Sequence, residues 1–118
     1  MTDLVACISS GEKGLAHVAK LVESQEWKNV FLIANEESKS NFKCSKKVNF
    51  VVVDFQKPVS ELIEDIRKSL DGKIYDLDVA LNMVSGTGKE HMAILSALLK
   101  LGLGIRLMAV TKNGVVEL

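Results

Sequence analysis

Residues 78–100, which read DVALNMVSGTGKEHMAILSALLK, decide the fold. Residues 79–84 are apolar apart from Asn82, a pattern typical of a strand that is buried on both faces of a parallel sheet. Residues 85–89, Ser-Gly-Thr-Gly-Lys, then form a short polar loop, and an apolar helix follows. The stretch therefore predicts a strand, a loop and a helix, the repeating unit of α/β proteins.

The loop 85–89 carries groups that bind anions. Its backbone N–H groups, its hydroxyls and the Lys89 ammonium gather at the N-terminus of a helix, where negative charge is favoured. A simpler interpretation stays open, in which the glycines only allow a tight turn and Ser85 or Thr87 is the N-cap of the helix.

Two other classes of phosphate-handling protein do not fit. A Walker-type nucleotide loop has glycine where Met83 stands and a magnesium-binding Ser or Thr where Glu90 stands. A phosphorylation receiver has a similar length, and Asp54 and Lys112 follow strands as its site residues do. Its magnesium site, however, needs an acidic pair after the first strand, where this chain has Ser9-Ser10.

The rest of the chain repeats the alternation of strand and helix. Apolar runs predict strands at 4–8, 30–34, 49–53 and 105–110. Apolar residues at helical spacing predict two further helices, with the stripes Leu15, Val18, Ala19 and Val22 and then Val59, Leu62, Ile63, Ile66 and Leu70. Asn113-Gly114 predicts a hairpin that returns an antiparallel edge strand, 115–118. The polar, lysine-rich segment 35–47 is expected to be a loop.

This order of elements predicts an α/β, Rossmann-like fold of one domain, residues 1–118. We expect a doubly wound, mainly parallel sheet in the order 3-2-1-4-5 plus the antiparallel edge strand, with helices on both faces. Ligands bind such sheets beyond the carboxyl ends of the strands, where the winding reverses, here between the first and fourth strands. The loops 9–14 and 85–89 leave the sheet there, with His91 one turn inside the next helix. The lysines of 35–47 are expected on the same edge, which suits a phosphate-bearing ligand.

Composition excludes several classes of protein. Fifteen basic and fifteen acidic residues cancel, so no positive field favours nonspecific binding to duplex DNA. The two cysteines and two histidines form no zinc pattern or disulfide framework, and Cys7 is expected in the core. The apolar runs are too short to span a membrane, and Asp3 lies where a signal peptide would be basic. We expect a cytoplasmic protein with no metal and no cofactor.

The helix after Lys89 is apolar over a wide arc. Its apolar residues form two stripes, Met92, Leu95 and Leu99 on one side and Ile94, Leu98 and Leu101 on another. Contact with one sheet does not use both, so we predict a two-fold homodimer. In the alternative, a neighbouring helix of the same chain covers the second stripe.

The segment 82–92, Asn-Met-Val-Ser-Gly-Thr-Gly-Lys-Glu-His-Met, resembles the signature of CARF domains, the CRISPR-associated Rossmann-fold sensors. The family pattern is Asn, an apolar residue, Thr-Gly-Gly-Thr-Lys, one more residue and Met, followed by a long apolar helix. Asn82, Gly86, Lys89 and the helix correspond, whereas the loop order differs and Met92 comes one place late. The resemblance covers 78–111, and Ile-Ser-Ser-Gly at 8–11 is similar to the family's other ligand loop.

The resemblance implies that a homodimer binds a cyclic oligoadenylate in antiviral signalling. A cyclic tetra- or hexa-adenylate has two-fold symmetry of its own and so matches an isologous dimer. Most family members carry a nuclease or a winged-helix domain as well, and neither output is expected from this chain. The implied ligand-binding residues are Ser9, Ser10, Gly11, Ser85, Gly86, Thr87, Gly88, Lys89 and His91.

Some stand-alone members of this family cleave the ring without a metal, through attack of a ribose 2′-hydroxyl on the adjacent phosphate. In a ring nuclease of this kind, Lys89 would stabilise the transition state, Ser10 or Ser9 would orient the attacking oxygen, and His91 is a candidate for proton transfer. Binding without cleavage is the alternative within the family. An α/β protein-interaction module with no nucleotide ligand is the alternative from another class.

Overall fold

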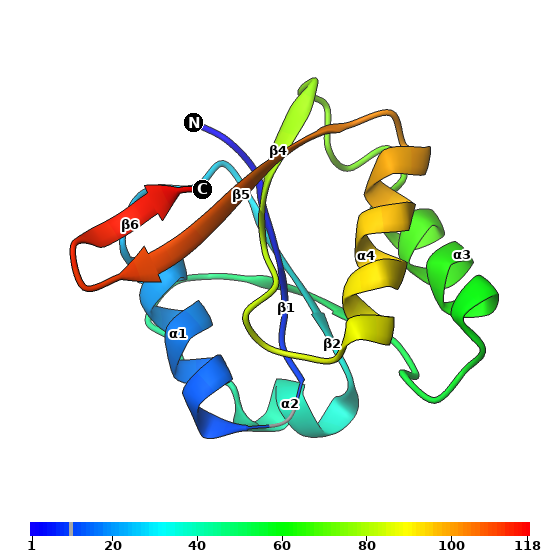
Figure 1. The fold of residues 1–118 in the computed structure, drawn as a ribbon, viewed down its shortest axis with the longest axis horizontal. Coiled ribbons are helices and arrows are strands. Elements are labelled where there is room, and N and C mark those ends of the chain that lie inside the picture. The colour runs from blue at the N-terminus through cyan, green and yellow to red at the C-terminus, as the bar shows by residue number, and fades with distance from the viewer. Residues whose placement is uncertain (10) are drawn as a thin grey trace.

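Within residues 1–9 and 11–118, which the computed structural model describes, six strands form one sheet in the order β3-β2-β1-β4-β5-β6 (Figure 1). Strands β1 to β5 run parallel and β6 pairs antiparallel with β5, which confirms the predicted topology. The strands are β1 (Leu4–Cys7), β2 (Val30–Ala34), β3 (Asn49–Val52), β4 (Asp78–Asn82), β5 (Gly104–Thr111) and β6 (Gly114–Glu117).

Helices cover both faces of the sheet. The helices are α1 (Glu12–Glu23), α2 (Glu36–Asn41), α3 (Val59–Leu70) and α4 (Gly88–Lys100). Figure 1 shows α3 and α4 together on one side of the sheet and α1 on the other. Because α1, α3 and α4 each follow one parallel strand and precede the next, they run back across the sheet, as doubly wound folds require.

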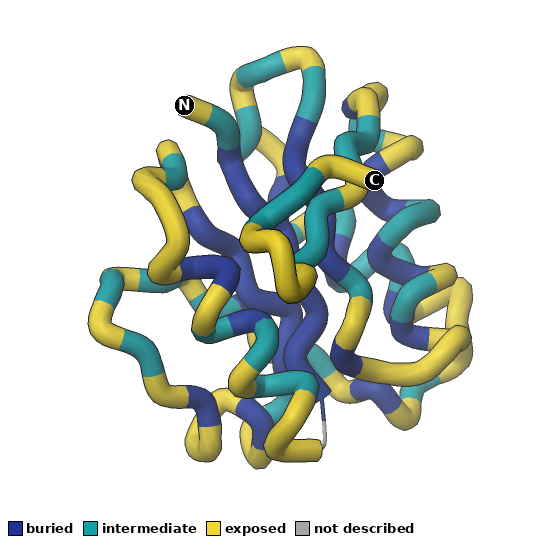
Figure 2. Tube along the Cα trace, turned by 60° about the vertical axis from the view of Figure 1, so that its left-hand side comes forward, coloured by how far each residue is buried: buried dark blue, intermediate teal, exposed yellow. Residues whose placement is uncertain are grey.

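The core lies on both faces of the central strands. Alternate residues of β1 point in opposite directions, so that Val5 and Cys7 pack toward α3 and α4 and Leu4 and Ala6 toward α1. Figure 2 shows the buried residues concentrated in the middle strands, whereas the β5–β6 hairpin is only partly covered. In the part of the chain described, no helix has the length and apolar character needed to cross a membrane.

Strand β4 ends two residues before the predicted end at Val84. The side chain of Asn82 causes this, because its Oδ1 accepts a hydrogen bond from the N–H of Val84 at 3.3 Å and turns the backbone. The loop that carries the anion-binding groups therefore begins at Met83, directly after the carboxyl end of β4.

The expected loop 35–47 contains a helix, α2. Asn35 is its N-cap, and Asn35 and Ser38 form a reciprocal capping box in which the Asn35 side chain accepts from the Ser38 N–H at 2.8 Å. The helix has six residues and almost no apolar stripe, so hydrophobic spacing did not predict it. The Asn-x-x-Ser spacing is the sequence signal that fits it.

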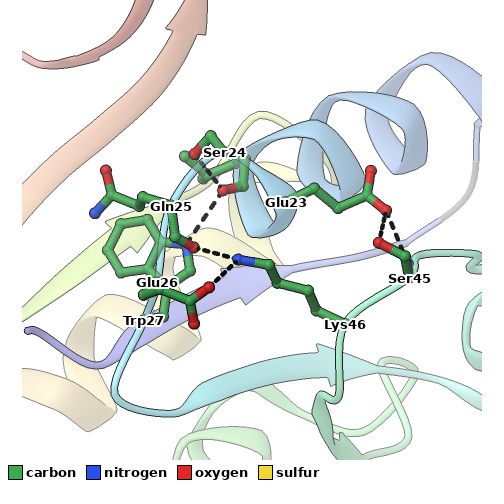
Figure 3. A network of polar contacts seen from close by, with 8 residues as sticks. Glu23, Ser24, Gln25, Glu26, Trp27, Ser45 and Lys46 are labelled. Atoms are coloured by element: carbon green, nitrogen blue, oxygen red, sulfur yellow. Dashed lines mark hydrogen bonds and ion pairs between the residues drawn. The ribbon is translucent and has the colours of Figure 1, made fainter.

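The lysines of 35–47 do not share one edge of the sheet, which corrects that part of the prediction. Lys43 lines a cavity at the carboxyl ends of the strands, but Lys46 lies beyond the C-terminal end of α1, at the opposite edge. Figure 3 shows Lys46 reaching the Gln25 carbonyl at 2.8 Å and the Glu26 carboxylate at 3.2 Å. The chain between α2 and β3 crosses the molecule, because parallel strands all start at the same edge.

Candidate functional site

The loops after β1 and β4 are joined to each other. Strands β1 and β4 are parallel neighbours, so both loops leave the same edge of the sheet. The Ser9 N–H donates to Ser85 Oγ at 3.0 Å. A Cβ on Gly14 would lie 2.9 Å from the Ser85 Cβ, so this contact between helix α1 and the second loop requires glycine. The structure thus brings together the two loops predicted from the sequence.

The loop 85–89 rests on the end of β1. Gly86 has φ +109°, and a Cβ there would lie 2.8 Å from both the Cys7 Sγ and the Glu90 Oε1. Burial, and secondarily the charge of Glu90, raise the pKa of the Cys7 thiol to about 12, so the thiol is neutral. The loop packs directly against this thiol. Gly86 therefore sets the shape of the loop through its backbone and its lack of a side chain.

Thr87 is the N-cap of α4. Its Oγ1 accepts from the Glu90 N–H at 3.3 Å, and the Thr87 N–H donates to Glu90 Oε1 at 2.9 Å. This capping box selects Thr87 over Ser85 and holds the Glu90 carboxylate at 7% exposure next to the loop. The carboxylate lowers the attraction of this helix end for an anion.

The groups left free for a ligand are backbone N–H groups. Among the described residues, the N–H groups of Gly86, Gly88 and Lys89 have no hydrogen-bond partner, and all three residues are exposed. The Lys89 ammonium donates to the Phe55 carbonyl at 3.0 Å, on the loop between β3 and α3. The first turn of α4 therefore carries both free amide donors and a lysine, groups of the kind that bind phosphate oxygens at helix N-termini.

The His91 side chain holds the loop 85–89 through a hydrogen bond to its backbone. Its Nε2 lies 2.8 Å from the Ser85 carbonyl oxygen, which can only accept, so Nε2 carries the proton and donates. This contact leaves Nδ1 for any other chemistry. Ser85 is 3% exposed, so both of its contacts hold the loop in place.

The first loop faces in two directions. Besides the contact of Ser9 with Ser85, Ser9 and Gly11 line a cavity of about 460 Å³ between α1 and α2, which the loop 85–89 does not line. Gly11 is also the N-cap of α1. Ser10, predicted as a ligand-binding residue and as the residue that orients the attacking oxygen, lies outside the described residues.

A second polar cluster lies beneath the loops and was missed from the sequence. The Asn82 Nδ2 donates to the Met108 carbonyl at 2.8 Å and lies 3.1 Å from His17 Nε2. The Val110 N–H donates to the same nitrogen at 3.4 Å, so Nε2 accepts and His17 is neutral. Asn82, the one polar residue of an apolar run, was the available signal, but His17 lies 65 residues away.

Comparisons with known proteins identify no family for this chain. A scan against models of protein families found no match, and a search of curated proteins found none either. The fold is Rossmann-like by its strand order and its crossovers. The resemblance to CARF domains therefore rests on the sequence pattern of residues 78–111 and 8–11 alone.

Proposed function

We propose that this chain is a sensor that binds a cyclic oligoadenylate as a homodimer, as its resemblance to CARF domains implies. The observation that carries the proposal is the set of exposed N–H groups of Gly86, Gly88 and Lys89 in the loop and helix turn that also carry the Lys89 ammonium. They lie where the winding of the sheet reverses, the usual ligand position in this fold.

In this proposal the loop 85–89 binds phosphate and the loop after β1 lies against the adjoining ribose. The Lys89 ammonium has three N–H donors and keeps its contact with the Phe55 carbonyl while it meets a phosphate oxygen. The contacts of Ser85, Gly86 and His91 within the protein hold these donors in position. Binding therefore costs little conformational entropy.

The outer face of α4 is the proposed dimer contact. Met92 is 65% exposed and Leu99 is 58% exposed, even though α3 packs beside α4, whereas Leu95 packs partly into the core. Met92 lies three residues after Lys89, on the same side of the helix. A two-fold dimer through this face would bring two Lys89 side chains toward the axis, where a two-fold symmetric ring can contact both.

Binding is proposed in preference to cleavage because two of the candidate catalytic side chains are held by contacts within the protein. His91 Nε2 is held by the Ser85 carbonyl, and Lys89 is held by the Phe55 carbonyl. Ring cleavage, if it occurs, would show in the titration as heat that continues after saturation.

Calorimetric titration with cyclic tetra-adenylate, and separately with cyclic hexa-adenylate, tests the proposal. We expect saturation at one ring for every two chains and at least a tenfold loss of affinity in Lys89→Ala. The matched control is Lys68→Ala, which removes an exposed lysine from the last turn of α3 and should leave affinity unchanged. Heat that continues after saturation would identify a ring nuclease. Absence of heat with both rings would refute the ligand assignment and favour an interaction module.

A further inference from the structure

The cavity between α1 and α2 has the size of a small-molecule site. Its volume is about 460 Å³, within the range of roughly 300–1,000 Å³ typical of ligand pockets. Figure 1 shows α1 and α2 near each other at the end of the sheet where β1 and β2 finish. The proposed phosphate site lies at the same edge, on the other side of the loop that contains Ser9.

One wall of this cavity is apolar. Leu15, Ala16 and Ala19 line it from α1. The two alanines stand three residues apart on one side of the helix, and each contributes only a methyl group to the wall. A flat ring fits against such a wall, as bases do in pockets lined by apolar side chains.

The facing groups are polar and include two carboxylates and one ammonium, that of Lys43. Glu12 and Glu37 line the cavity, and neither forms an ion pair with a residue in the described part of the chain. Their charges repel phosphate and accept hydrogen bonds from amino groups. Asn41 also lines the cavity, and an asparagine amide can pair with N6 and N7 of adenine at once.

We propose that this cavity binds the adenine base of a nucleotide whose phosphate lies on the loop 85–89. The inference rests on the proposed function and adds to it the group that selects the base. The backbone at Ser9 lies between the two sites, since its N–H contacts Ser85 while the residue lines the cavity. One nucleotide would thus have its base at the carboxylates and its phosphate at the amides of α4, on the two sides of Ser9.

Adenosine tests the cavity separately from the phosphate site, because it has a base and no phosphate. Titration of the ¹⁵N-labelled protein is expected to shift the amide signals of Ala16, Ala19 and Asn41. Inosine should bind at least tenfold more weakly, because its 6-oxo oxygen is an acceptor and faces the carboxylates. Ala16→Leu fills the cavity from an exposed helix position and should abolish the shifts, whereas Lys89→Ala should keep them.

The control for the added bulk is Lys20→Leu, which places the same side chain on α1 at a position that does not line this cavity. It should bind adenosine as the wild type does.

Equal binding of adenosine and inosine, or no shift at Ala16, Ala19 and Asn41, would overturn the inference. If cyclic tetra-adenylate binds the wild type and Ala16→Leu equally, the phosphate site stands and the base cavity is wrong. If adenosine shifts these signals but neither cyclic adenylate binds, the base cavity stands and the proposed function fails.

Discussion

The Ser9 N–H donates a hydrogen bond of 3.0 Å to the Ser85 hydroxyl, which joins two loops that lie 76 residues apart in the chain. The hydroxyl is buried with its residue at 3% exposure, so no water replaces it at this N–H. The contact fixes the distance between the end of β1 and the start of α4. Both proposed ligand sites depend on it.

Ser85→Ala should destabilise the protein by about 1–3 kcal/mol, because it leaves the buried Ser9 N–H without an acceptor. Urea denaturation of both proteins measures the loss of free energy. Ser60→Ala, at an exposed position of α3, is the control and should stay within about 0.5 kcal/mol of the wild type. Equal stability of Ser85→Ala and Ser60→Ala would show that the two loops are not held by this bond.

Gly86→Ala should cost more stability than Gly72→Ala. Both glycines have positive φ, +109° and +77°, so a side chain strains the backbone at both. At Gly72 an added Cβ meets nothing within 4 Å, whereas at Gly86 it meets the Cys7 Sγ and the Glu90 Oε1, each at 2.8 Å. Thermal or urea unfolding of the two variants separates strain from this clash, and equal losses would mean that the loop does not rest on Cys7.

Glu90→Gln should strengthen binding of the cyclic adenylate. Glutamine keeps the acceptor for the Thr87 N–H, so the capping box remains, while the negative charge beside the proposed phosphate site disappears. We expect affinity to rise about two- to fivefold, the effect of one charge at a helix N-terminus. Glu61→Gln, in the first turn of α3, is the control for loss of an acidic residue and should bind unchanged. Weaker binding by Glu90→Gln would place the phosphates elsewhere.

The neutral His17 should make the protein less stable in acid. Burial first, and the charge of Lys20 second, lower the pKa of His17 below its ordinary 6.5. The folded state therefore favours the neutral ring, and the unfolded state takes up the proton first. This contribution to stability is present above pH 6.5 and is lost as the pH falls below that value toward the lowered pKa.

His17→Gln isolates that effect, because a glutamine oxygen accepts from Asn82 and Val110 without titrating. Urea midpoints of both proteins at about pH 8 and about pH 5 give the comparison. The wild type should lose more stability than the variant between the two values. An equal loss would show that His17 does not titrate differently in the folded state.

Leu99→Glu should dissociate the proposed dimer, since it places a charge on the outer face of α4. Leu77→Glu is the control, because Leu77 is 90% exposed and belongs to the segment before β4 and not to α4. In a sedimentation experiment, we expect the wild type and Leu77→Glu to be dimers and Leu99→Glu to be a monomer. A monomeric wild type would contradict the dimer.

The sheet was predictable from the sequence because its strands are short apolar runs. Between these runs, apolar residues at helical spacing identify most of the helices. Once β1 and β4 are neighbours, the meeting of the loops at Ser9 and Ser85 follows from topology. The C-terminal hairpin was equally clear from Asn113-Gly114, which specifies a tight turn. Fold prediction succeeded where a local pattern decides the structure.

The contacts within the site were not predictable, because each depends on a partner that no local pattern identifies. The donation from His91 to the Ser85 carbonyl and the contact of Lys89 with Phe55 are of this kind. The pairing of His17 with Asn82 is a further case, across 65 residues. Helix α2 was missed for another reason, because its six residues are held by a capping box in place of an apolar stripe.

Amide chemical shifts of the ¹⁵N-labelled protein, recorded as cyclic tetra-adenylate is added, test the central claim most directly. If phosphate binds at the start of α4, the signals of Gly86, Gly88 and Lys89 should move most and should saturate at one ring for every two chains. Binding of the ring with no change at these three amides, or no binding at all, would contradict the account.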